Sequence, residues 1–112
     1  MSNRRIVFYG DYFEKFYERL SAKARLKFDY VLKLITEVEF VPEKFLKNLA
    51  GAQGLYEIRI KAGGNACRIF SLFDEKGLIV LLNAFQKKSQ KTPKSEIVLA
   101  EQLRKHYFLE KR

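Results

Sequence analysis

The chain has 112 residues, of which 47% are hydrophobic and 14% aromatic, enough apolar side chains for one domain, residues 1–112, with its own core. The net charge is +9, and residues 55–112 carry most of the excess with twelve basic and six acidic side chains, which predicts an anionic partner for that half. A single cysteine, Cys67, and a single histidine, His106, exclude a disulfide framework and a zinc site.

The first half of the chain predicts a short strand followed by two helices. Ile6 to Tyr9 is β-prone, and Asp11 with Glu14 three residues later is a helix-start signature. The helix that follows has one apolar face, made of Phe13, Phe16, Tyr17 and Leu20. Ser21 can cap a second helix. The apolar face of that helix is Ala24, Phe28, Val31, Ile35 and Val38. Both faces are expected to pack on a sheet as a helical hairpin.

The second half changes to strands and ends in a helix. Apolar and polar residues alternate from Tyr56 to Lys61, and two further strands are expected over 66–73 and 78–85. Thr92 is expected to cap the last helix, with Pro93 at its first position. The inner face of this helix is Ile97, Ala100, Leu103 and Tyr107. The predicted fold class is therefore α+β in the order βααβββα, with the two-helix hairpin on a small, mainly antiparallel sheet and a C-terminal helix.

The turns predict which side chains share a face of the sheet. A two-residue turn at Gly63-Gly64 places Arg59 opposite Arg68, and a four-residue turn at the next hairpin places Arg68 opposite Asn83. The residues expected on the arginines' face, away from the helical hairpin, are Asn83, Phe85 and Lys87. Opposed like charges destabilise a sheet, so an anion is expected between the arginines. The alternative is that Glu57, diagonal to Arg68, neutralises the pair.

The stretch from Ala84 to Lys94 joins the last strand to the last helix. It contains four lysines and no acid: Lys87, Lys88, Lys91 and Lys94. Backbone amides and cations at such a junction can converge on phosphate oxygens. The alternative is a solvated basic loop, and the nearby arginine pair favours the phosphate site.

Several segments carry a resemblance to a known family. They read Leu-Tyr-Glu-Ile-Arg from Leu55, Cys-Arg-Ile-Phe from Cys67, and Leu-Leu-Asn-Ala-Phe-Gln-Lys-Lys-Ser-Gln-Lys-Thr-Pro from Leu81, with Glu-Ile-Val-Leu-Ala from Glu96. In these segments the chain resembles the RelE/HigB superfamily of bacterial toxins, and more narrowly its phage-derived, HigB-like branch. The Phe-x-Lys-Lys-x-x-Lys-Thr-Pro block is the most specific part, and the order of elements extends the likeness over essentially the whole chain.

The resemblance implies the toxin of a type II toxin–antitoxin system. Such a toxin would be a ribosome-dependent endoribonuclease that cleaves mRNA and inhibits translation without a metal or cofactor. Its partners would be mRNA, the ribosome and a helix-turn-helix antitoxin, and it would reach operator DNA only through the antitoxin. No apolar run is long enough for a signal peptide or a membrane span, so a cytoplasmic protein without a membrane partner is expected. The alternatives are a non-catalytic, ParE-like inhibitor of DNA gyrase and a basic binding module without toxicity.

The resemblance also implies roles for the basic residues. Attack of a ribose 2′-OH on the adjacent phosphate requires stabilisation of a dianionic, five-coordinate phosphorus, and Arg68 matches the family's arginine at the scissile phosphate. Arg59 matches a basic position one strand earlier, and Lys87 and Lys88 match the basic pair after the last strand, as phosphate ligands or proton carriers. Glu57 departs from members that have a basic residue at its position. The residues expected to bind RNA are Lys61, Lys88, Lys91 and Lys94.

Two further candidates for proton transfer lie near the end of the chain. His106 is the one side chain whose ordinary pKa suits acid–base work near neutrality, and family members often place a catalytic His or Tyr there, which makes His106 and Tyr107 catalytic candidates. Alternatively, His106 is an exposed residue that stabilises the helix dipole and Tyr107 is a core residue. Cys67 is expected to be a buried strand residue.

Overall fold

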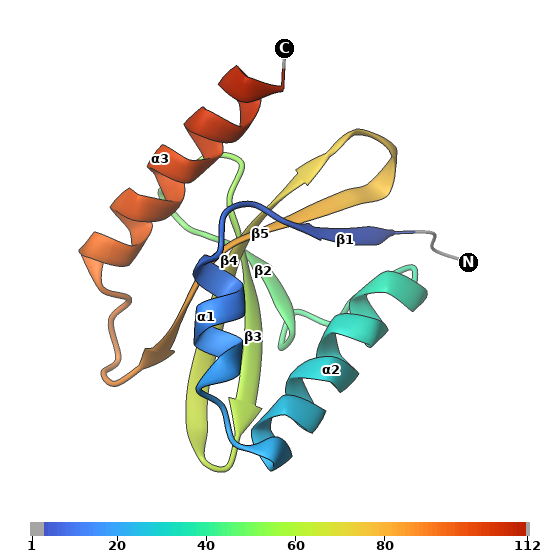
Figure 1. The fold of residues 1–112 in the computed structure, drawn as a ribbon, viewed down its shortest axis with the longest axis vertical. Helices are drawn as coiled ribbons and strands as arrows, with labels where there is room; N and C mark the ends of the chain where they lie inside the picture. Colours follow the sequence, from blue (N-terminus) through green and yellow to red (C-terminus); the bar gives the residue numbers. More distant parts are fainter. Residues whose placement is uncertain (1–3, 112) are drawn as a thin grey trace.

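The computed structural model describes residues 4–111, which form a five-stranded mixed sheet and three α-helices (Figure 1). The elements are β1 (Arg5–Phe8), α1 (Tyr12–Glu18), α2 (Ala22–Glu37), β2 (Leu46–Asn48), β3 (Tyr56–Ala62), β4 (Asn65–Asp74), the 3₁₀ turn η1 (Glu75–Gly77), β5 (Leu78–Lys87) and α3 (Lys94–Glu110). The strand order is β1-β5-β4-β3-β2, with β1 parallel to β5 and the other neighbours antiparallel. The predicted α+β fold is confirmed.

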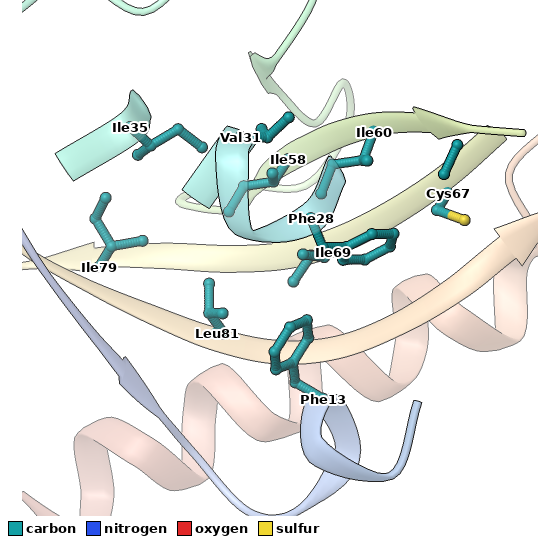
Figure 2. Packing of buried hydrophobic residues seen from close by; sticks show 11 residues of the cluster. Phe13, Phe28, Val31, Ile35, Ile58, Ile60, Cys67, Ile69, Ile79 and Leu81 are labelled. Carbon is teal, nitrogen blue, oxygen red and sulfur yellow. The ribbon is translucent and has the colours of Figure 1, made fainter. Parts of the chain in front are cut away.

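One face of the sheet is covered by α1 and α2. Phe13 of α1 and Phe28 of α2 lie with their ring centroids 6.5 Å apart, and both point toward the strands (Figure 2). The strand residues of this cluster are Ile58, Ile60, Ala62, Cys67, Ile69, Ile79 and Leu81. The apolar faces predicted for both helices are therefore the faces that they bury, since burial of aromatic and branched side chains stabilises the pair on the sheet.

The opposite face is covered by α3. Ala100 and Leu103 are its buried residues, and Ile97 and Tyr107 are packed beside them, as the helical spacing predicts. They meet a second cluster of strand residues, made of Phe70, Leu72, Val80, Leu82 and Phe85. Because β4 and β5 are buried on both faces, their sequences are nearly continuous apolar runs rather than alternating ones. Within residues 4–111, no helix is long and apolar enough to cross a membrane.

The helix starts agree with the sequence at α2 and differ at α3. The Ser21 hydroxyl accepts a hydrogen bond from the Ala24 N–H (3.1 Å), as predicted for a cap. The prediction that Thr92 caps the last helix is wrong: Pro93 occupies the cap position, no side chain caps the helix, and the first helical residue is Lys94. The carbonyl of Pro93 accepts the N–H groups of Glu96 and Ile97, so the first turn closes on the backbone.

Two pairings complete the sheet beyond the predicted meander. The short strand β2 was not predicted; it pairs with β3 in the register Leu46 opposite Ile58. Three residues are too few for a period-two pattern to be visible in a sequence. The first strand, β1, pairs in parallel with only the first part of β5, from Leu78 to Leu81. The second half of β5 therefore has a strand on one side only, and α1 and the start of α3 flank its other side (Figure 1).

The predicted register is right at one hairpin and wrong at the next. Arg59 lies opposite Arg68, as the turn at Gly63-Gly64 predicts. The pairing of Arg68 with Asn83 is wrong, because Arg68 lies opposite Phe85. The turn η1 places Asp74 opposite Leu78, whereas a four-residue turn would place Phe73 there, so the register shifts by one residue. An irregularity after Ile69 shifts the register by one more residue. The two shifts add up to two residues. Because side chains alternate along a strand, Phe85 stays on the predicted face of the sheet, the face of the arginines.

Candidate functional site

The arginine pair, Arg59 and Arg68, lies on the sheet face opposite α1 and α2. Their strand neighbours Ile58, Ile60, Cys67 and Ile69 belong to the cluster under those helices, and side chains alternate along a strand. The Arg68 side chain is 13% exposed and that of Arg59 is 29% exposed. Two guanidinium groups are thus held side by side at a half-buried position, as the sequence predicts.

The carboxylate of Glu57 lies between the two guanidinium groups. Its Oε1 is 3.1 Å from Nε of Arg68 and 3.8 Å from Nε of Arg59. Neither Nε has an aligned hydrogen-bond acceptor among residues 4–111, so both contacts are electrostatic rather than well-formed hydrogen bonds. One carboxylate cannot balance two guanidinium groups, and the three side chains retain one positive charge. Glu57 therefore neutralises the pair in part, as the alternative predicts, and the anion between the arginines stays a prediction.

Arg68 is further fixed by its own strand, since its Nη1 donates to the carbonyl of Cys67 (3.0 Å). Cys67 is buried as predicted, and burial raises the pKa of its thiol. The thiol belongs to the core under α1 and α2, on the opposite face of β4 from Arg68. Arg68 is thus a preorganised donor, whereas Cys67 serves packing.

A cavity of about 510 Å³ opens beside the arginine pair at the edge of β3. Among residues 4–111, its lining includes Phe45, Ile60 and Ala66 and no acid. It also includes five cations, which are Lys27, Lys44, Arg59, Lys61 and Arg68. The backbone positions this wall, because the Arg59 N–H donates to the carbonyl of Phe45 (2.8 Å). Of the lining lysines, Lys61 was predicted, whereas Lys27 on α2 and Lys44 before β2 were not. Only the tertiary fold brings these two to the arginines, so no local pattern could have shown them.

A second cavity, of about 440 Å³, lies on the other side of Arg68. It is lined by Ala66, Arg68, Lys87, Lys88, Ser89 and Gln90. Lys87 pairs with Ala66 across β4 and β5, so it is the diagonal neighbour of Arg68 on the same face. Arg68 is therefore shared by two basic cavities. Lys91 and Lys94 are exposed farther along the same segment and line neither cavity.

The two candidates for proton transfer lie at the other end of the sheet. The Tyr107 hydroxyl donates to Asp74 Oδ2 (2.6 Å), and Asp74 ends β4, six residues after Arg68. At the rise of a strand, six residues span about 20 Å. His106 is exposed on the same turn of α3. The structure therefore brings Lys87 and Lys61 to the arginine pair and leaves His106 and Tyr107 apart from it.

Tyr107 belongs to a balanced hydrogen-bonded cluster. Lys111 Nζ lies 2.7 Å from Asp74 Oδ1, and the hydrogen bonds from Lys111 and Tyr107 lower the pKa of Asp74 to about 2. The same hydrogen bond to Asp74, with burial, raises the pKa of Tyr107 to about 12. A phenol with so high a pKa is held as a hydrogen-bond donor, which suits a structural contact better than proton exchange near neutrality.

Comparison with known proteins gives one finding. No curated protein matches the chain significantly. The family described as "Phage derived protein Gp49-like (DUF891)" matches residues 15–105, which include the arginine pair and the basic segment after β5. The match covers most of the 112 residues. The chain therefore belongs to the Gp49-like family of phage-derived proteins, which is part of the RelE/HigB toxin superfamily.

Proposed function

We propose that the protein is the toxin of a type II toxin–antitoxin module and acts as an endoribonuclease on mRNA at the ribosome. The observation that carries the proposal is the arginine pair with its single carboxylate, flanked on both sides by basic cavities. An excess of fixed positive charge on a preorganised surface suits a phosphate that gains negative charge during the reaction. Membership of the family supports the same activity.

The reaction would be an internal transesterification. The 2′-hydroxyl oxygen of a ribose attacks the adjacent phosphorus and gives up its proton to water. The bond from phosphorus to the 5′-oxygen of the next nucleotide breaks, and a cyclic phosphate and a free 5′-hydroxyl result. Arg68 would bind the phosphate oxygens and Arg59 would add a second cation as their charge rises. Lys87, the diagonal neighbour of Arg68, would donate a proton to the leaving 5′-oxygen. His106 and Tyr107 lie away from the arginine pair, so their location does not support a role for them in proton transfer.

The wider basic surface would bind the rest of the substrate. Lys61 and Lys88 line the two cavities beside Arg68, and Lys91 and Lys94 extend the positive charge toward α3. Each cation would contribute sequence-independent affinity for phosphates of mRNA or of the ribosome. A helix-turn-helix antitoxin is the partner we propose for neutralisation, and operator DNA would be reached through it alone.

Induced expression without an antitoxin tests the proposal. The wild-type protein is expected to arrest growth and stop translation, because mRNA is cut, whereas Arg68→Ala at equal soluble levels is not. Growth, incorporation of labelled amino acid and primer extension on a translated mRNA are measured together. Normal growth at proven soluble levels would contradict the toxin function. Growth arrest with gyrase-dependent DNA breaks and intact mRNA would instead identify the ParE-like activity.

A further inference from the structure

The second half of β5 has a free edge. β1 pairs with β5 only from Leu78 to Leu81, and among residues 4–111 no strand lies on that side of the residues that follow. Gln86 is exposed and Ala84 is half-buried, so this edge is open to solvent between α1 and the start of α3. A sheet edge without a neighbouring strand is a template on which another chain can pair.

The hydrogen bonds of the sheet show how the backbone of β4 is oriented. The Arg59 N–H donates to the carbonyl of Phe45 (2.8 Å), on the side of β3 away from β4. Directly opposed residues of antiparallel strands exchange both backbone hydrogen bonds or neither. Arg68 lies opposite Arg59, so it turns its N–H and C=O away from β3 and toward Phe85 of β5.

This orientation determines which groups of β5 face the free edge. Phe85 turns its backbone groups toward Arg68, and these groups alternate in direction along a strand. The N–H and C=O groups of Ala84 and Gln86 therefore point away from β4. No backbone group among residues 4–111 bonds them from that side. The edge thus presents two donors and two acceptors at the spacing of a β-strand.

Two adjoining cavities, of about 400 and 380 Å³, follow this edge. Gln86 lines both of them, and Ala84 lines the larger one. Phe16 and Leu20, from α1 and the turn after it, form a half-buried apolar wall. An added strand would gain backbone hydrogen bonds from the edge and side-chain contacts from this wall, which are the two contributions that strand addition uses.

The charge of the two cavities favours an acidic segment. Three exposed cations line them, which are Arg19, Lys23 and Lys88, and none of these forms an ion pair among residues 4–111. Glu96 is the one acid that the described residues contribute to the lining, and its Oε1 accepts a hydrogen bond from Asn83 Nδ2 (2.9 Å). The excess of positive charge attracts carboxylates.

From these observations we infer that the free edge of β5 binds an extended, acidic segment of a protein partner, which adds a strand to the sheet. A second copy of this chain is disfavoured, because each copy carries a net charge of +9 and the two would repel each other. A nucleic-acid strand could use the cations but would not match the row of alternating backbone donors and acceptors, which a peptide backbone does match. The inference goes beyond the proposed function, because it does not require that the protein cleaves RNA.

Amide hydrogen exchange of the ¹⁵N-labelled protein tests the inference. In the free protein the amides of Ala84 and Gln86 are expected to exchange fast and that of Phe85 slowly. The probe is a synthetic hexapeptide of alternating glutamate and valine with blocked ends, which is expected to slow exchange at Ala84 and Gln86. The same peptide with every amide N-methylated has no donors and is expected not to do so. A peptide with lysine in place of glutamate is expected to act only at higher concentration.

A substitution at the edge removes a single donor. Gln86→Pro deletes the N–H that points away from β4, and proline is tolerated in an edge strand where the N–H faces solvent. It is expected to weaken binding of the glutamate peptide about fivefold, whereas Gln86→Ala, which keeps the N–H, is expected to change it little. Lys23→Ala is expected to weaken binding about twofold, and Lys33→Ala, at an exposed lysine of α2 that lines neither cavity, is the matched control. Melting temperatures show whether each variant keeps its fold.

Several outcomes would overturn the inference. They are slow exchange at Ala84 and Gln86 in the free protein, equal binding of the glutamate and lysine peptides, and unchanged binding by a folded Gln86→Pro. If Gln86→Pro does not fold, binding of the N-methylated peptide to the wild type decides instead, since equal binding would exclude strand addition. Protection of the same amides by a single-stranded RNA at lower concentration than by the peptide would assign the groove to nucleic acid. These measurements do not depend on cleavage, so a protein without nuclease activity could still bind the peptide.

Discussion

Two carboxylates, Glu57 on β3 and Asp74 at the end of β4, are surrounded by donors, and their surroundings differ in charge. Asp74 receives one ammonium and one phenol at hydrogen-bonding distances of 2.7 and 2.6 Å, and its charge is balanced. Glu57 faces two guanidinium groups, at 3.1 and 3.8 Å, and is outnumbered. A balanced cluster stabilises a helix end, whereas an unbalanced one keeps affinity for an anion from outside. This difference favours the surroundings of Glu57 for the proposed reaction and those of Asp74 for structural support.

The largest effect is expected for Arg68→Ala. Loss of a contact that strengthens in the transition state typically costs about 3 kcal/mol, which is about two orders of magnitude in rate. Single-turnover cleavage of a ribosome-bound mRNA measures it. Arg68→Lys keeps the charge but not the planar donor fork, so it should rescue only part of the rate. Full activity in Arg68→Ala would remove the arginine pair from the chemistry.

Tyr107→Phe is expected to affect stability and not cleavage. The variant keeps the ring in the core and removes the hydrogen bond to Asp74, which typically costs about 1 kcal/mol, or about 4 °C in melting temperature for a domain of this size. His106→Gln should change neither quantity, because His106 is exposed. A hundredfold loss of cleavage in either variant, with the fold kept, would give the end of α3 a catalytic role.

The pH dependence of stability reports on the Asp74 cluster at both extremes. The pKa of Asp74 is lowered from 3.8 to about 2, so the unfolded chain takes up a proton that the folded protein does not, and stability should fall as pH falls from about 4 to 2. The pKa of Tyr107 is raised from 10.0 to about 12, so the unfolded chain loses its proton first and stability should fall as pH rises from about 10 to 12. Denaturant unfolding across pH measures both.

Tyr107→Phe serves as the control for the alkaline limb. Hydrogen bonds to Glu110 and Asp29 also raise the pKa values of Tyr9 and Tyr17, so part of the alkaline loss should remain in the variant. An identical alkaline limb in the variant and the wild type would mean that the contact between Tyr107 and Asp74 does not form in solution.

The smallest effects are expected at the lysines that only the fold brings to the arginines. Lys27→Ala and Lys44→Ala should each weaken RNA binding modestly and reduce the slope of log affinity against log salt by about 0.7 per lost phosphate contact. Lys33→Ala, an exposed lysine of α2 that does not line the cavity, is the matched control. Equal effects of all three substitutions would indicate general electrostatic attraction of RNA to the protein rather than binding at a defined surface.

Short-range sequence patterns correctly predicted the structural features that depend on a few neighbouring residues. The apolar faces of the helices and the hairpin at Gly63-Gly64 follow from short periods and one tight turn, so the pairing of Arg59 with Arg68 is correct. The register of the next hairpin is wrong, because the length of η1 and the irregularity after Ile69 depend on how β5 packs on both faces. Phe85 kept its predicted face only because two shifts of one residue add to a full period of the strand.

The residues of the candidate site also separate into those that short-range patterns predict and those that only the tertiary fold brings together. Arg59, Arg68 and Lys87 lie on neighbouring strands, so the alternation of side chains and the order of the hairpins are enough to bring them together. Lys27 and Lys44 reach the same cavity from α2 and from the segment before β2, and only three-dimensional packing determines that approach. His106 and Tyr107 were assigned from the family resemblance and from the ordinary pKa of histidine. Neither of these indicates how far the end of α3 lies from the arginine pair.

The central claim is that cleavage depends on the arginine pair and stability on the Asp74 cluster. Its most direct test is primer-extension mapping of a translated mRNA with Arg68→Ala and Tyr107→Phe side by side, with thermal unfolding of the same preparations. Arg68→Ala is expected to lose the cuts and keep most of its melting temperature, and Tyr107→Phe is expected to keep the cuts and melt lower. Cuts retained by Arg68→Ala and lost by a folded Tyr107→Phe would contradict the account.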